Sequence, residues 1–201
     1  MKKILATILL FGSLWGLFEC SVGDFLHGYD LSVVTAAFAI FLMSVTRLKY
    51  GRSGMQLGMA LVAGLLRHFN PVGTCLICSS IAIIIEGLAF EIIWIFPWRK
   101  YNTLSMKVGM GVISFYSIYA IGYLVTQILT PLFTATFFLS DLIGVLPKIS
   151  SQAVLAGIIG SVSLPLAFWV DSLSISFKDK FYYPTTFSLI CMCWIAAIAG
   201  I

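Results

Sequence analysis

The stretch Gly64–Phe96, GLLRHFNPVGTCLICSSIAIIIEGLAFEIIWIF, decides what kind of fold this chain can form. An apolar run ends at Arg67 and His68, turns through a short segment, and is followed by a second apolar run that contains Glu86 and Glu91. An ionised carboxylate in hydrocarbon costs several kcal/mol or more, so such residues usually face a protein interior, a cavity or a partner. The stretch therefore predicts membrane-spanning helices whose acidic residues carry the chemistry of the protein.

The composition of the whole chain also predicts a membrane protein. The 201 residues are 60% hydrophobic and 10% charged, with a mean hydropathy of +1.04, whereas soluble domains carry about 25% charged residues. A chain this apolar cannot cover itself with polar surface, so the lipid bilayer must be its solvent. At about 20 residues per span, we expect one domain over residues 1–201, an all-α polytopic transmembrane helical bundle of six to eight spans. The apolar runs are too long and too uniform for barrel strands, which alternate.

The distribution of basic residues favours seven spans with the N-terminus in the cytoplasm. We expect these spans near residues 4–26, 31–46, 54–69, 72–96, 106–129, 152–170 and 183–201. Ten of the twelve Lys and Arg residues then lie on the cytoplasmic side, where basic residues are enriched, and only Arg67 and Lys148 lie outside. The segment 131–147, with Pro131 and Pro147 at its ends, is short for a span, and we expect a re-entrant or interfacial segment.

A small set of polar residues lies toward the outer side of this topology. An outward pocket with acidic walls, one arginine and one histidine would suit a small polar or cationic molecule. The alternative is a structural ion pair that joins Arg67 to Glu19 or Asp24 and holds the first and third spans together. The basic residues form no single patch, so no nucleic-acid partner is expected. The candidate ligand-binding residues are Trp15, Glu19, Arg67, His68, Asn70 and Glu86.

Glu86 is the candidate that is hardest to explain without a ligand. No basic residue lies at its depth, since Arg67 is placed well above it at the outer boundary. Ser79, Glu86 and Phe90 share one stripe of the fourth span. This stripe would line a path inward from the outer mouth, so we expect Glu86 to form the floor of a ligand site.

The five cysteines all lie in apolar surroundings, and we expect them to be small buried residues. Cys75 and Cys78 nevertheless form a C-x-x-C, a spacing that can give a redox-active pair. It resembles the pair in membrane oxidoreductases that reoxidise disulfide-forming enzymes. Those proteins need a second pair on an external loop, whereas Cys191 and Cys193 lie inside the last span. A membrane thiol-disulfide oxidoreductase is therefore the alternative function.

Other enzyme classes have little support in the sequence. There is no H-E-x-x-H or G-x-S-x-G motif, and two histidines are few for a metal site. We therefore expect no metal and no cofactor, and we favour a protein that is not an enzyme. A structural or assembly subunit of a membrane complex is a further alternative.

The layout of the chain resembles the substrate-binding S components of energy-coupling factor vitamin transporters. The resemblance is strongest over residues 1–100 and rests on chain length, span number, the first helix with Gly12 and Gly16, and an apolar fourth helix with Glu86-Gly-Leu. It implies that Gly12 and Gly16 dock a membrane partner subunit, which works with an ATPase, in a prokaryotic cell (inner) membrane. The family has six spans and usually alanines at the small positions. Close packing within the chain is the alternative for the two glycines.

These expectations together predict an integral membrane protein that binds or transports a small molecule. The resemblance adds that it would be the substrate-binding subunit of a multi-component importer. The sequence shows neither the substrate nor the energy source.

Overall fold

The computed structural model describes residues 2–27, 31–72, 76–95, 103–133, 139–173 and 179–200. Every secondary-structure element in these ranges is helical, so the predicted all-α fold is confirmed. Cys75 lies outside the described residues, as do the side chains of Asp24 and His27. The elements are α1 Lys2–Phe18, a π-helical turn Glu19–Gly23, α2 Asp24–His27, α3 Ser32–Tyr50, α4 Met55–Phe69, α5 Leu76–Ile93, α6 Leu104–Phe133, α7 Leu139–Ser172 and α8 Asp179–Ala199.

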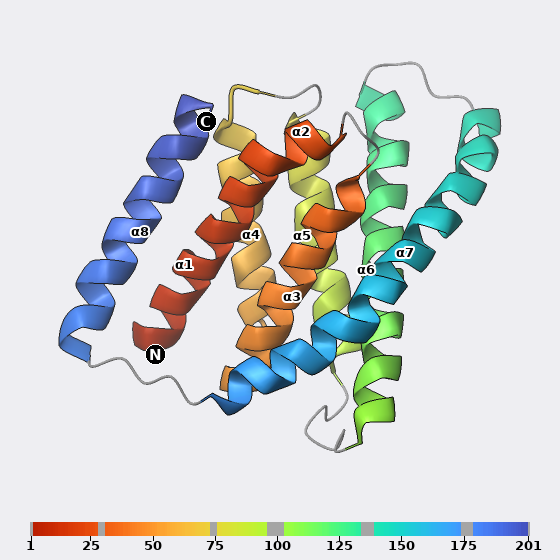
Figure 1. Ribbon diagram of the computed structural model, residues 1–201. Coiled ribbons are helices and arrows are strands. Elements are labelled where there is room, and N and C mark those ends of the chain that lie inside the picture. Colours follow the sequence, from red (N-terminus) through yellow and green to blue (C-terminus); the bar gives the residue numbers. More distant parts are fainter. Residues whose placement is uncertain are drawn as a thin grey trace.

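Six helices of the described chain are long and apolar enough to cross a membrane, which makes this an integral membrane protein. Their outer faces carry many exposed large apolar side chains, as lipid contact requires. The 15-residue α4 spans only about 22 Å, but it packs along α1 and α5 in the middle of the bundle (Figure 1). The predicted range of six to eight spans is confirmed. The number of long helices is six and not the favoured seven because the predicted third span, α4, is short.

The two ends of the bundle differ in charge. Figure 1 shows the N-terminus at one end and the C-terminus at the other. At the N-terminal end, α3, α5 and α7 end and α4, α6 and α8 begin. Arg99, Lys100 and Lys178 lie outside the described residues, as does the side chain of Lys180. The described basic residues at the N-terminal end are Lys2, Lys3, Arg47, Lys49, Arg52 and Lys107.

The predicted re-entrant or interfacial segment over 131–147 is wrong for the residues described. Residues 131–133 complete α6, and residues 139–147 form the first turns of α7. Pro147 and Pro165 both lie inside this 34-residue helix, because membrane helices tolerate the lost hydrogen bond of a proline. At about 51 Å, α7 is longer than the hydrocarbon layer, and it leans across the bundle over α6 and α3 (Figure 1).

Gly12 and Gly16 form the contact between α1 and α4. A Cβ on Gly12 would lie 2.7 Å from the carbonyl oxygen of Met59, and one on Gly16 would lie 2.9 Å from Cβ of Leu66. Both glycines are buried within the chain. Their predicted role in docking a partner subunit is therefore wrong, and the alternative, packing within the chain, is what the structure shows.

A buried polar network joins α3, α4 and α5 at the N-terminal end of the bundle. Arg47 is 3% exposed, and its Nη1 lies 3.1 Å from Oε2 of Glu91. The same guanidinium donates to the carbonyl oxygens of Arg52 and Trp94 at 2.8 and 3.0 Å. The backbone N–H of Gln56 donates to Oε1 of Glu91 at 3.1 Å. Glu91 is thus a structural residue, because its charge and both of its oxygens are matched.

Candidate functional site

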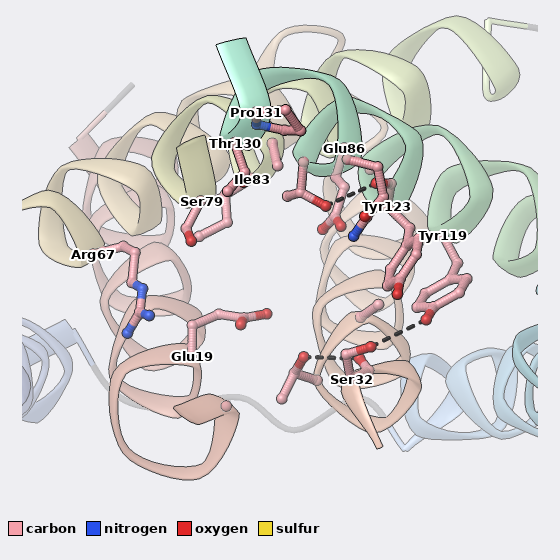
Figure 2. A pocket seen from close by; sticks show the side chains of 17 residues that line it. Glu19, Ser32, Arg67, Ser79, Ile83, Glu86, Tyr119, Tyr123, Thr130 and Pro131 are labelled. Carbon is pink, nitrogen blue, oxygen red and sulfur yellow. Dashed lines mark hydrogen bonds between the residues drawn. The ribbon is translucent and has the colours of Figure 1, made fainter. Parts of the chain in front are cut away.

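A polar cavity of about 320 Å³ lies at the end of the bundle opposite the Arg47 network. It is enclosed by the π-helical turn after α1 and by α3, α4, α5 and α6, and Figure 2 shows its side chains converging on one space. The volume is within the range of small-molecule sites, about 300–1,000 Å³. The lining residues are Glu19, Gly23, Ser32, Thr35, Ala36, Arg67, Ser79, Ala82, Ile83, Glu86, Tyr119, Gly122, Tyr123, Thr126, Gln127, Thr130 and Pro131.

The π-helical turn at the end of α1 places Glu19 in the cavity. Such turns are rare, and they occur frequently at functional sites because they redirect side chains. Gly23 closes the turn, and a Cβ there would lie 3.1 Å from Oε2 of Glu19 and 3.7 Å from Cγ2 of Thr35. Glycine therefore leaves the space that the Glu19 carboxylate occupies. In Figure 2 this carboxylate points toward the middle of the cavity.

Glu86 reaches the cavity from α5, on the same stripe as Ser79 and Ile83. Its carboxylate lies against Gly122 of α6, where a Cβ would clash with Oε1 of Glu86. Oε2 of Glu86 is buried, and no hydrogen-bond donor of the described residues reaches it. The predicted stripe of α5 is confirmed for Ser79 and Glu86. Phe90 is fully buried instead and stacks on Trp94, with ring centroids 4.9 Å apart.

Helix α6 supplies the largest share of the cavity wall. Its lining residues recur three or four positions apart, so they form one stripe along about the last four turns of the helix. The rings of Tyr119 and Tyr123 are stacked, with centroids 5.7 Å apart. Thr126 donates to the carbonyl oxygen of Tyr123 at 2.7 Å. The α6 residues in the wall are Tyr119, Gly122, Tyr123, Thr126, Gln127, Thr130 and Pro131.

The remaining walls come from α3 and α4. Ser32, the first residue of α3, shares a hydrogen bond of 3.1 Å with the hydroxyl of Tyr119, and Thr35 donates to the carbonyl oxygen of Ser32 at 2.9 Å. Arg67 is 7% exposed and lies in the last turn of α4. Figure 2 shows Arg67 and Glu19 on one side of the cavity and the tyrosine pair on the opposite side.

Three of the six predicted ligand-binding residues share this cavity, namely Glu19, Arg67 and Glu86. Trp15, His68 and Asn70 do not line it. Their predicted role in ligand binding is wrong for this cavity, and each has a position that explains why.

Trp15 is fully buried in the core of the bundle, and His68 is exposed at the end of α4. Asn70 is buried and joins two segments, because its Nδ2 donates to the carbonyl oxygen of Ala197 at 2.9 Å. Its Oδ1 accepts from the N–H of Val72 at 2.7 Å. Asn70 therefore fixes the end of α4 against the end of α8.

The sequence did not lead us to predict that α3 and α6 line the cavity, although α6 contains a recognisable pattern of polar residues. Tyr119, Tyr123, Thr126, Gln127 and Thr130 follow helical spacing inside an otherwise apolar span. A polar stripe of that period indicates a face turned away from lipid. Ser32 and Thr35 gave no comparable signal, since short hydroxyl side chains are common in membrane helices.

The cysteines do not all behave as packed thiols. Cys78 is disulfide-bonded and almost fully buried, at 1% exposure, so its interpretation as a packed thiol is wrong. Cys75 lies outside the described residues. Cys191 and Cys193 are free thiols on α8, a helix that packs on α1 and α4 and contributes nothing to the cavity wall.

The charges and polar groups of the cavity favour binding over covalent catalysis. Among the described residues, two carboxylates and one guanidinium face it, together with hydroxyl groups and the Gln127 amide. Within the described ranges, no group of three or more His, Cys, Asp or Glu residues could hold a metal ion. The arrangement can hold a polar molecule by charge and by many hydrogen bonds.

Comparison with known proteins gives no relative for this arrangement. No protein-family model, no curated protein and no solved structure matches the chain.

Proposed function

We propose that this membrane protein binds a small polar solute in the cavity between the π-helical turn after α1 and helices α3, α4, α5 and α6, and that it transports this solute. The observation that carries the proposal is the unpartnered carboxylate oxygen of Glu86 at a cavity lined mostly by polar groups. A polar group buried without a partner costs free energy. A ligand that satisfies Glu86 would remove that cost.

The position of the cavity supports transport rather than storage. It opens from the end of the bundle opposite the basic residues, and basic residues mark the cytoplasmic side. A solute would therefore enter from outside the cell, as in an importer.

A test of solute binding needs a variant that blocks the cavity without changing any charge. Ser79→Phe places a ring in the cavity, while Ile77→Phe places the same ring on the outer face of α5, where Ile77 is 47% exposed. The protein is reconstituted in nanodiscs and screened against a library of polar solutes by thermal unfolding. We expect at least one solute to raise the Tm of wild type and Ile77→Phe but not of Ser79→Phe. A library without any such compound would contradict the proposal.

A role as the substrate-binding subunit of a multi-component importer is part of the same proposal. The resemblance in layout to S components supports it, as does a solute cavity near one end of the bundle. Because α4 covers Gly12 and Gly16, a coupling subunit would have to dock on another face. A neighbouring gene for a coupling-type ATPase would favour this role.

Thiol-disulfide exchange is the second candidate function, and the disulfide at Cys78 favours it. Electron transfer through such a pair needs a second redox centre nearby, but Cys191 and Cys193 lie on α8, away from the cavity. Under the binding proposal, the Cys75→Ser, Cys78→Ser double variant keeps its solute-induced rise in Tm. Loss of quinone-linked thiol oxidation in this variant would instead favour the redox function.

A further inference from the structure

We infer that the solute is a small organic cation whose ammonium group is held between the Glu86 carboxylate and the ring of Tyr123. This inference rests on the proposed solute site and names the chemical class of its ligand. It starts from the difference between the two acidic residues of α5.

No described residue matches the charge of Glu86. Within the described residues Glu86 makes no ion pair, and its Oε2 accepts no hydrogen bond. Glu91, on the same helix, is paired with Arg47 and held by Gln56. Burying a carboxylate without a partner costs far more than burying a matched pair. Glu86 therefore has the environment of a group whose partner arrives from outside the chain.

Arg67 is the basic residue of the cavity wall, but it does not serve as that partner. Figure 2 shows it on the opposite side of the cavity from Glu86, beside Glu19. Among the described lining residues, one side of the cavity thus carries both charges, and the side around Glu86 carries a carboxylate without a basic residue. A ligand with a positive group at the Glu86 side complements this distribution.

The aromatic residues next to Glu86 favour an organic cation. Gly122 contacts the Glu86 carboxylate, and the following residue, Tyr123, stacks with Tyr119 in the same wall. Ring faces attract ammonium groups, and such cation–π contacts are favourable in sites shielded from water. A carboxylate beside aromatic rings satisfies both the charge and the apolar surface of an alkylammonium group.

A metal ion fits the cavity less well. The described residues contain no cluster of three or more His, Cys, Asp or Glu residues, and about 320 Å³ is far more than one ion needs. The hydroxyl groups on α3 and α6, with Gln127, can instead bind a polar body attached to the ammonium group. The site thus fits an amine or quaternary ammonium compound with further hydrogen-bonding groups.

Three probes of one shape and different charge test this inference. Choline is the cation, 3,3-dimethylbutan-1-ol is its neutral isostere, and 3,3-dimethylbutanoate is the anion. Binding to the nanodisc-reconstituted protein is measured by titration calorimetry. We expect choline to bind, and to bind roughly tenfold or more tightly than either isostere, because only the cation carries a positive charge to offset that of the carboxylate.

Single substitutions test which residues cause the preference for choline. Glu86→Gln should remove the preference for choline over the neutral isostere, whereas Ile77→Phe, on the outer face of the same helix, should retain it. Tyr123→Phe keeps the ring and should keep choline binding, while Tyr123→Leu should weaken it several-fold.

Each contrary outcome has a definite meaning. Equal binding of the neutral isostere, tighter binding of the anion, or no binding of any probe would overturn the inferred ligand class. The library screen with Ser79→Phe decides separately whether the cavity binds a solute at all, so the two proposals can fail independently.

Discussion

Glu86 and Glu91 lie on the same helix in equally apolar sequence, yet the fold gives them different partners. Glu91 meets Arg47, because α3 continues to Tyr50 and carries Arg47 inside the bundle. Glu86 meets the backbone of Gly122 and the cavity. One carboxylate is thus part of the fold, while the other lines the cavity.

This contrast predicts opposite effects on stability. Glu91→Gln leaves Arg47 buried without its counter-charge, which typically costs about 3–5 kcal/mol. Glu86→Gln should leave the free energy of unfolding nearly unchanged, and Glu86→Leu should be at least as stable as wild type, because it removes an unpartnered polar group. Thermal unfolding in detergent measures both.

A matched pair of variants strengthens the test at Arg47. Arg47→Met alone leaves Glu91 buried without its counter-charge. The double variant Arg47→Met, Glu91→Leu removes both charges, so it should recover much of the stability that Arg47→Met alone loses. Equal destabilisation by Glu86→Leu and Glu91→Leu would show that Glu86 also has a structural partner.

At the scale of single residues, the sequence predicted how deep a side chain lies in the membrane but not which way it points within the bundle. Glu86 was identified because a carboxylate is conspicuous in an aliphatic run. Trp15 and Asn70 lie at suitable positions along the chain, but their side chains turn into the packed interior. Arg47 was expected in a loop, because its basic neighbours indicated one. The sequence did not indicate that α3 continues for another turn, to Tyr50.

Among the elements, α6 and α7 form the closest helix contact. A Cβ on Gly111 would clash with the carbonyl oxygen of Gly160, and one on Gly160 would lie 2.6 Å from Cγ of Phe115. Small residues allow backbones to approach closely in lipid, where packing drives association. The fixed distance between the two helices holds the cavity-lining face of α6 toward α3 and α5.

Alanine at this crossing should therefore destabilise the bundle. We expect Gly111→Ala to lower the free energy of unfolding by about 1–3 kcal/mol, the usual cost of overpacking. Gly109→Ala, two positions away on α6, should be neutral or slightly stabilising, because a Cβ there would have no atom of the described residues within 4 Å. Thermal unfolding of the two variants compares them, and equal Tm values would contradict the close contact.

The sequence predicted the position and the ends of a helix only where its polar residues or prolines fit the helical period. The α5 stripe was found because Ser79 and Glu86 are spaced as a helix requires. The prolines misled at 131–147, since each suggested a helix end, whereas Pro131 lies in the last turn of α6 and Pro147 lies inside α7. The π-helical turn over Glu19–Gly23 was not predicted from the sequence.

At the scale of the whole molecule, the charge pattern and the helix order agree. The described Lys and Arg residues of α1, α3, α6 and the α3–α4 connection lie at the N-terminal end of the bundle (Figure 1). The cavity lies at the other end. Orientation follows from the charge distribution because translocation of basic loops is disfavoured. The fold class could therefore be predicted from composition alone, while the cavity required the lateral arrangement of five helices.

This orientation predicts which sites an impermeant thiol reagent reaches in intact cells. Cysteine introduced at Arg52, in the α3–α4 connection, should not be labelled above the wild-type level from outside, whereas cysteine at Val72, at the opposite end, should be. The same contrast should hold between Asn102 and Val72. Ready labelling at position 52 or 102 would reverse the assigned orientation.

The opposite placement of the two chain ends has a consequence for genetic fusions (Figure 1). In a tandem repeat joined by a short linker, the second copy begins on the side where the first copy ends. It must then either insert upside down or acquire an extra crossing in the linker. Split reporters follow the same geometry: halves fused to the two ends of one molecule stay on different sides of the bilayer and cannot reassemble.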